Sequence, residues 1–152
     1  MNPLKSINQI RLIYFVIVAL LSMFAIFSIY FVITFGQFYE TDGTSINNLK
    51  ALSIILALAG IPASYMFHKR KVAHIDRSLP AHKKLLHYRN SFFIKIITLE
   101  GVSLISLLIY LITIHINQLI IFGLIFLFLL LNYPRRQVIL DELEIDESEL
   151  KL

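Results

Sequence analysis

The sequence predicts an all-α integral membrane protein with four transmembrane helices and both termini on the cytoplasmic side. Composition indicates the class: 57% of the 152 residues are hydrophobic and only 16% are charged, whereas a soluble domain averages roughly 45 to 50% apolar and about 25% charged residues. The mean hydropathy of +0.74 agrees with this. The uneven distribution of lysine and arginine between the loops gives the orientation. The length is that of a single domain, residues 1–152.

Four apolar segments have about the length of a membrane crossing, which takes about 20 residues for about 30 Å of hydrocarbon. They span residues 12–36, 49–67, 92–114 and 118–133. The first lies in a stretch of 28 residues without charge, between Arg11 and Glu40. That is longer than the apolar part of a signal peptide, about 7 to 15 residues, so we expect a retained helix. In the second segment, Pro62 predicts a bend, because proline removes a backbone donor.

The third and fourth segments come from one long apolar stretch. Phe92 to Tyr133 is apolar almost throughout its 42 residues, and a single helix of that length would be about 63 Å long. The chain must therefore reverse within it. The polar cluster available for the turn comprises Thr113, His115, Asn117 and Gln118. Asn117 is suited to end one helix or to cap the next, so we expect a tight hairpin here.

Charge asymmetry between the loops predicts the orientation, because cytoplasmic loops carry the excess of lysine and arginine. The loop at residues 68–91 has a single carboxylate, Asp76, and seven basic residues: Lys69, Arg70, Lys71, Arg77, Lys83, Lys84 and Arg89. The loop between the first two segments has Glu40 and Asp42 and no basic residue. We therefore expect the 68–91 loop, and with it both termini, on the inner side of a bacterial cytoplasmic membrane.

The segments outside the spans also carry structural signals. Ser78, followed by Leu79 and Pro80, predicts a helix start, with serine as the cap and proline in the first turn. The 68–91 loop is thus expected to be partly helical. The acidic tail, residues 137–152, has six carboxylates between Asp141 and Glu149. It is expected either to dock on the basic loop as a short helix or to stay in solvent.

Glu100 is the most informative residue for function, because it lies about 13 Å into the third segment. A carboxylate near the bilayer centre costs about 2.5 to 3.5 kcal/mol, so it should find a partner or be protonated. Two interpretations remain open: a proton or cation site, or an interhelical hydrogen bond that fixes packing. Ser103, one turn on, and Ser64 and Ser22 at similar depth complete the candidate polar site.

The basic residues have three interpretations: topology alone, contact with anionic lipid headgroups, or docking of the acidic tail. The candidates for headgroup or tail contact are Lys69, Arg70, Lys71, Lys83, Lys84, Arg89 and Lys95. Lys95 lies about 5 Å inside the third segment and is expected to extend its ammonium back to the headgroups. It does not share a helical face with Glu100, which is five residues away.

Several functional classes have no support in the sequence. There is no cysteine, and the loop histidines His68, His74, His82 and His87 are not spaced as an adjacent helical pair, so no metal site is expected. No phosphate-binding glycine loop and no catalytic constellation is present, so neither an enzyme nor a cofactor is expected. The net charge of +4 comes from the basic loop and does not indicate nucleic-acid binding.

In size and helix count the chain resembles the small multidrug-resistance transporters, a four-helix family that uses an acidic residue within the membrane. Their acidic residue lies in the first helix of a shorter chain, whereas Glu100 lies in the third segment. We therefore assign no family. The expected function is a non-enzymatic accessory or interaction subunit, with membrane lipids and another membrane protein or a second copy as partners. The alternative is a proton- or cation-coupled transporter, or a channel-like oligomer, that uses Glu100.

Overall fold

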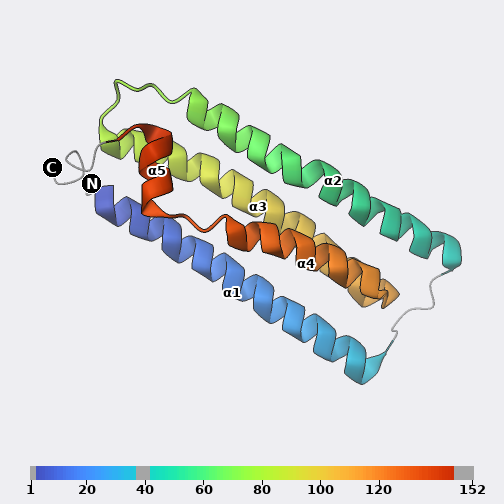
Figure 1. The fold of residues 1–152 in the computed structure, drawn as a ribbon. Coiled ribbons are helices and arrows are strands. Elements are labelled where there is room, and N and C mark those ends of the chain that lie inside the picture. The colour runs from blue at the N-terminus through green and yellow to red at the C-terminus, as the bar shows by residue number, and fades with distance from the viewer. Residues whose placement is uncertain (1–2, 37–41, 146–152) are drawn as a thin grey trace.

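The computed structural model describes residues 3–36 and 42–145, and this part of the chain is helical with no strand. Its five helices follow in the order α1 (Pro3–Phe35), α2 (Gly43–Ala73), α3 (Ala81–Thr113), α4 (Ile116–Leu131) and α5 (Arg136–Leu143) (Figure 1). Helices α1, α2 and α3 are long and apolar enough to cross a membrane. Helices α4 and α5 pass the same test together but are bent by 72°, so the described residues hold three or four candidate spans.

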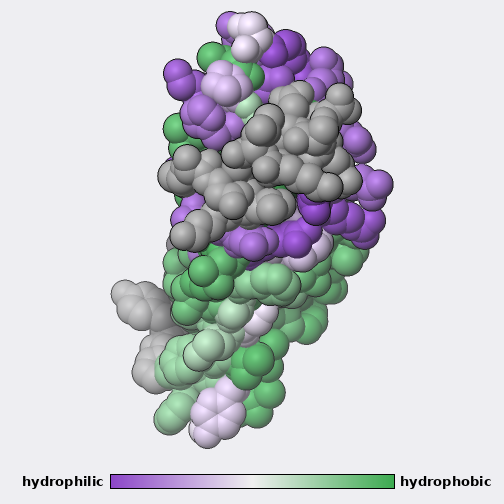
Figure 2. Space-filling view, turned by 90° about the vertical axis from the view of Figure 1, so that its left-hand side faces the viewer, coloured by the Kyte–Doolittle hydropathy of each residue, from purple (hydrophilic) through white to green (hydrophobic). Residues whose placement is uncertain are grey.

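The long helices form an elongated bundle (Figure 1). The start of α1, the α2–α3 connection and α5 lie together at one end, which we call the basic end because it carries the basic residues of the 68–91 loop. In Figure 2, hydrophilic residues gather on this end, and hydrophobic residues cover the flank of the helices beside it. The expected outer loop with Glu40, and the acidic tail beyond Ile145, lie outside the described residues.

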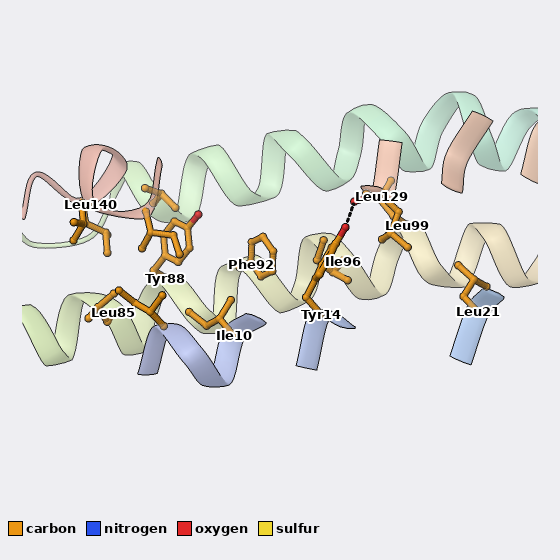
Figure 3. Packing of buried hydrophobic residues seen from close by; sticks show 14 of the residues in the cluster. Ile10, Tyr14, Leu21, Leu85, Tyr88, Phe92, Ile96, Leu99, Leu129 and Leu140 are labelled. Atoms are coloured by element: carbon orange, nitrogen blue, oxygen red, sulfur yellow. Dashed lines mark hydrogen bonds between the residues drawn. The ribbon is translucent and has the colours of Figure 1, made fainter. Parts of the chain in front are cut away.

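Helix α3 is the centre of the bundle, because α1, α2 and α4 all pack against it. Half of its most apolar window is buried, compared with 22% for α1 and 11% for α2. Phe92, Ile96 and Leu99 of α3 form the middle of the core (Figure 3). Tyr14 of α1 adds a polar tie, since its buried hydroxyl donates to the carbonyl oxygen of Leu129 over 3.0 Å (Figure 3).

Helices α1, α2 and α3 are longer than the predicted segments, because they begin earlier in the chain. Helix α4 has the predicted length but lies two residues earlier, and one predicted helix start is wrong. Helix α3 begins at Ala81 with Pro80 as its N-cap, whereas the sequence indicated Ser78 as cap and Pro80 within the first turn. The reason is local: the backbone N–H and the hydroxyl of Ser78 both donate to Asp76 Oδ1, over 2.9 and 2.8 Å. The Asp76 carboxylate thus engages Ser78 in a turn of the loop and prevents it from capping a helix.

The reversal between α3 and α4 lies at the predicted place but uses different residues. Helix α3 ends with Ile114 in the left-handed region, at φ 54°, and His115 is the N-cap of α4. Asn117, the expected cap, lies inside α4. Because the turn takes only two residues, the two helices form a tight antiparallel hairpin. Gln118, immediately after the turn, is fully buried and accepts a hydrogen bond from Ser53 of α2.

Helix α2 continues through Pro62 without interruption. It approaches α3 closely at Gly60, two residues before the proline. A Cβ atom added at Gly60 would lie 2.7 Å from Val102 Cγ2. Such a contact requires the helices to separate, because the valine side chain is short and branched. Gly60 therefore permits the close packing of α2 on α3, as small residues commonly do between membrane helices.

We predict that Gly60→Ala destabilises the bundle by about 1 to 3 kcal/mol, the usual range for overpacking. The matched control is Gly123→Ala in α4, where nothing lies within 4 Å of the added Cβ. There, alanine should be neutral or stabilise the helix by up to about 1 kcal/mol. Denaturant unfolding of the purified protein in mild detergent measures both. Equal effects at the two positions would contradict this packing.

Candidate functional site

The described polar and charged side chains converge most clearly at the basic end, where α5 packs across the bundle. Ile139, Leu140 and Leu143 of α5 are buried there. Figure 3 shows Leu140 facing Leu85 and Tyr88 of α3. These apolar contacts hold α5 against α3, and they place the polar side chains of α5 beside the ends of α2 and α3.

His68 of α2 is the buried centre of the polar contacts, with 6% of its surface exposed. Its Nδ1 atom lies 2.9 Å from Ser91 Oγ of α3, and its Nε2 atom lies 3.4 Å from Glu142 Oε2 of α5. The Tyr88 ring stands edge-on to the imidazole, with 5.2 Å between centroids. His68 thus connects three helices through side chains alone.

Arg77, in the α2–α3 connection, forms a second link to α5. Its Nη1 donates to the backbone carbonyl of Glu142 over 3.2 Å, and its Nη2 lies 3.3 Å from Glu144 Oε1. Both side chains of this ion pair are exposed, so it contributes about 1 kcal/mol or less. The bond to the Glu142 carbonyl satisfies an acceptor near the C-terminus of α5, where a cation is also favoured by the helix dipole.

The Glu142 carboxylate is shared between several neighbours. Its contact with His68, opposed in part by burial, lowers its pKa below the ordinary value, and Tyr88 and Lys95 act in the same direction. The carboxylate is therefore held in its charged form when α5 is docked. This links the position of α5 to the ionisation of one residue.

An open cavity of about 760 Å³ lies beside these contacts. Its walls come from α2, the α2–α3 connection, α3, the end of α4, the α4–α5 connection and α5. Lys95 lines the cavity and is 7% exposed. Its ammonium lies 5.3 Å from the ring centroids of both Tyr65 and Phe92. A cavity of this size and mixed lining is in the range of ligand sites in proteins.

The four residues of the predicted intramembrane site make separate contacts. Ser22 donates to the Val18 carbonyl and Ser64 to the Ile61 carbonyl, each over 2.7 Å within its own helix. Ser103 is fully buried, and its hydroxyl has no hydrogen-bond partner in the described part of the chain.

Glu100, one turn before Ser103 on α3, is partly buried. None of the four side chains is hydrogen-bonded to another within the described residues.

The predicted headgroup or tail contacts fall into different surroundings. Lys69 and Lys95 line the cavity, whereas Arg70 and Lys71 line a second, smaller cavity of about 580 Å³. Lys83 is exposed, Lys84 is buried and Arg89 is partly buried. Within the described residues, the side chains of His68, Arg77 and Tyr88 bind the C-terminal part of α5. Of the predicted residues, Lys95 interacts with it through electrostatic attraction to Glu142.

Sequence reasoning missed His68, Tyr88, Arg77 and Glu142 as members of one site. The apolar pattern of Ile139, Leu140 and Leu143 was a usable signal, since it gives the tail one buried face. The partner of that face could not be read from the pattern. Across residues 3–36 and 42–145, no three histidine or acidic side chains are grouped to hold a metal ion.

We predict that docking of α5 depends on pH. Because the pKa of Glu142 is lowered on docking, its contribution is fully present above the ordinary value of 4.5 and is lost as pH falls through the lowered value. Hydrogen exchange of the amides at 139–145 should therefore quicken on acidification. Since the Glu142 side chain is 39% exposed, Glu142→Gln should raise the equilibrium constant for undocking of α5 at neutral pH by no more than about fivefold.

Asp141→Asn is the matched control for this prediction, because Asp141 is the exposed neighbour of Glu142 and carries the same charge. Its exchange rates should remain those of the unmodified protein. The same acceleration in both variants would contradict a specific role of Glu142.

Comparison with known proteins gives no match to a family model, a curated protein or a solved structure.

Proposed function

We propose that the chain is a four-helix membrane protein of the bacterial cytoplasmic membrane, with α1 to α4 as spans and both termini in the cytoplasm. The charge asymmetry of the loops supports this orientation. The position of the start of α1, the α2–α3 connection and α5 at one end of the bundle agrees with it (Figure 1). In this arrangement the basic end faces the cytoplasm, and α5 lies at the membrane surface.

The proposed orientation can be tested with single cysteines, since the sequence contains none. Ser78→Cys and Thr44→Cys both lie at exposed positions, at opposite ends of α2. A membrane-impermeant maleimide should label Thr44→Cys in intact spheroplasts and label Ser78→Cys only after lysis. Labelling of Ser78→Cys in intact spheroplasts would contradict a cytoplasmic basic end.

We further propose that the protein acts as a non-enzymatic accessory or interaction subunit. The observation that carries this proposal is the basic end, where buried His68 and exposed Arg77 hold α5 in place beside an open cavity. The flanks of α1 and α2 support it, because they present large exposed apolar side chains, including Ile26 and Leu58. Such flanks are suited to a partner helix as well as to lipid.

Site-specific photocrosslinking in cells tests the interaction role. A photoreactive residue at Leu58 or Ile26, which are 71% and 68% exposed, should give a discrete adduct of fixed mass with one partner protein or a second copy. The control position is Leu99, which is fully buried and should give no such adduct. Lipid adducts alone at both exposed positions would contradict the proposal.

A specific observation also favours a second candidate, a proton- or cation-coupled transporter. Glu100 is partly buried inside a candidate span, one turn from the buried hydroxyl of Ser103, which has no hydrogen-bond partner in the part of the chain that the structure describes. A carboxylate and a free hydroxyl on neighbouring turns are a suitable start for a proton or cation path.

We predict that Glu100→Gln separates the two functions. In a transporter reconstituted in vesicles, the variant should abolish proton-coupled flux, because glutamine cannot ionise. In an accessory subunit, it should leave the fold and the Leu58 adduct unchanged. Asp76→Asn, which removes an exposed carboxylate from the α2–α3 connection, is the control and should leave flux unaffected. Flux that survives Glu100→Gln would exclude the transporter mechanism.

A further inference from the structure

Lys95 is a buried cation without a hydrogen-bonded partner. Only 7% of its surface is exposed, and no hydrogen bond or salt bridge reaches its ammonium within the described residues. Two aromatic rings lie near it, those of Tyr65 and Phe92, each with its centroid 5.3 Å from Nζ. Rings attract a cation through their negative faces, but they accept no conventional hydrogen bond from it. All three donors of the ammonium therefore remain available.

The nearest source of negative charge is already engaged. Glu142 attracts Lys95 electrostatically, but its carboxylate is in contact with His68 and interacts with Tyr88. Burying an ammonium is costly unless it is paired and hydrogen-bonded. A ligand oxygen in the cavity that Lys95 lines would supply the missing acceptor.

The charge on the cavity wall indicates the sign of the charge on that ligand. Among the described residues, one carboxylate lines the cavity, that of Glu142. Four cationic side chains line it as well: Lys69, Arg77, Lys95 and Arg135. The Arg77 side chain is already bound to the C-terminal part of α5. Lys69 and Arg135 are exposed and make no side-chain hydrogen bond or ion pair within the described residues. Among the described residues, the wall thus has an excess of positive charge, with one buried cation and two exposed cations that have no partner there.

The remaining lining indicates an amphiphilic surrounding. Tyr65, Met66 and Leu131 belong to the last turns of the apolar parts of α2 and α4, and they share the cavity with the charged groups. Tyrosine and lysine side chains at this level of a membrane protein typically meet lipid headgroups. The cavity therefore lies where the apolar flank of the bundle changes to the basic end.

We propose that this cavity binds the phosphate group of an anionic ligand, with Lys95 as its buried anchor and Lys69 and Arg135 at its rim. Phosphate oxygens accept several charge-assisted hydrogen bonds at once, which suits the three free donors of Lys95 and the guanidinium of Arg135. The volume of about 760 Å³ accommodates a headgroup together with the first part of an acyl chain. The phosphate comes either from an anionic phospholipid or from a soluble phosphate compound.

Thermal unfolding of the purified full-length protein in neutral detergent micelles tests the proposal. The probes are short-chain phosphatidylglycerol, short-chain phosphatidylcholine and inorganic phosphate, the last balanced against chloride at constant ionic strength. A ligand that binds the folded state raises the unfolding midpoint in a saturable way. We expect phosphatidylglycerol to do so and phosphatidylcholine to have little effect.

Lys95→Gln should weaken phosphatidylglycerol binding at least about tenfold, because the loss of one hydrogen bond to a charged group reduces the affinity by about this factor or more. Lys83→Gln is the matched control, because Lys83 is an exposed lysine of the same helix and does not line the cavity. Its affinity should stay within about twofold of the unmodified protein. Arg135→Gln, at the exposed rim, should weaken binding by a smaller factor, and it serves as the test if Lys95→Gln does not fold.

Some outcomes identify the source of the phosphate, and others contradict the proposed site. Saturable, Lys95-dependent stabilisation by inorganic phosphate and not by phosphatidylglycerol would support the site and assign it a soluble ligand. Equal losses in Lys95→Gln and Lys83→Gln would overturn it, because that result indicates general surface attraction. Equal stabilisation by the two lipids, or no saturable shift with either phosphate probe, would also overturn it.

This inference rests on the proposed function in placing the cavity at a cytoplasmic membrane surface. The phosphate site and the interaction role are nevertheless tested by different measurements. The titration uses purified protein and needs no partner. Loss of Lys95-dependent binding with the Leu58 adduct intact would overturn the phosphate site alone. A missing adduct with binding intact would overturn the interaction subunit alone.

Discussion

The rest of the structure depends on the enclosure of α3 by three other helices. A helix surrounded in this way must present small or well-packed side chains in several directions at once. The approach of α2 at Gly60, where Val102 occupies the space of a side chain, shows how closely the neighbours come. Because α3 provides packing surface for α1, α2 and α4, α1 and α2 bury little of their own surface and remain on the flanks (Figure 1).

Enclosure of α3 also explains why the polar contacts gather at one end. Along the middle of the bundle, serine and threonine hydroxyls donate mainly to carbonyls of their own helix, as Ser106 and Thr113 do. Such bonds satisfy the hydroxyl without any partner from another helix. At the basic end, by contrast, α2 and α3 are joined through His68 and Ser91, and α5 adds Glu142. There, side chains from three helices contact one another.

The sequence was most informative where length and apolarity alone decide the structure. A stretch of 42 apolar residues has to reverse, and α3 and α4 do turn back within it, although Ile114 and His115 make the turn and Asn117 does not. Local polar chemistry was less predictable, because several partners compete for each group. Ser78 had the pattern of a helix cap, yet it donates its hydrogen bonds to the carboxylate of Asp76, two residues away.

The candidate site was the least accessible to prediction, because its residues are distant in the chain. His68 and Glu142 are 74 positions apart, and only the docking of α5 brings them together. The sequence places Lys95 near one end of the third segment. Its burial beside Tyr65 and Phe92 depends on how α2 packs against α3. Spacing along one helix carries no information about such a neighbour.

The short α4 has a consequence for the bilayer around the protein. Its 16 residues give a helix about 24 Å long, less than the hydrocarbon thickness of about 30 Å, whereas the 33 residues of α3 extend for about 50 Å. With α4 as a span in the proposed arrangement, thinning of the lipid leaflets beside it would relieve this mismatch, and the leaflets would recover their thickness around α1 and α2. The protein would then deform its membrane on one side only. Annular lipids with shorter acyl chains would collect along α4.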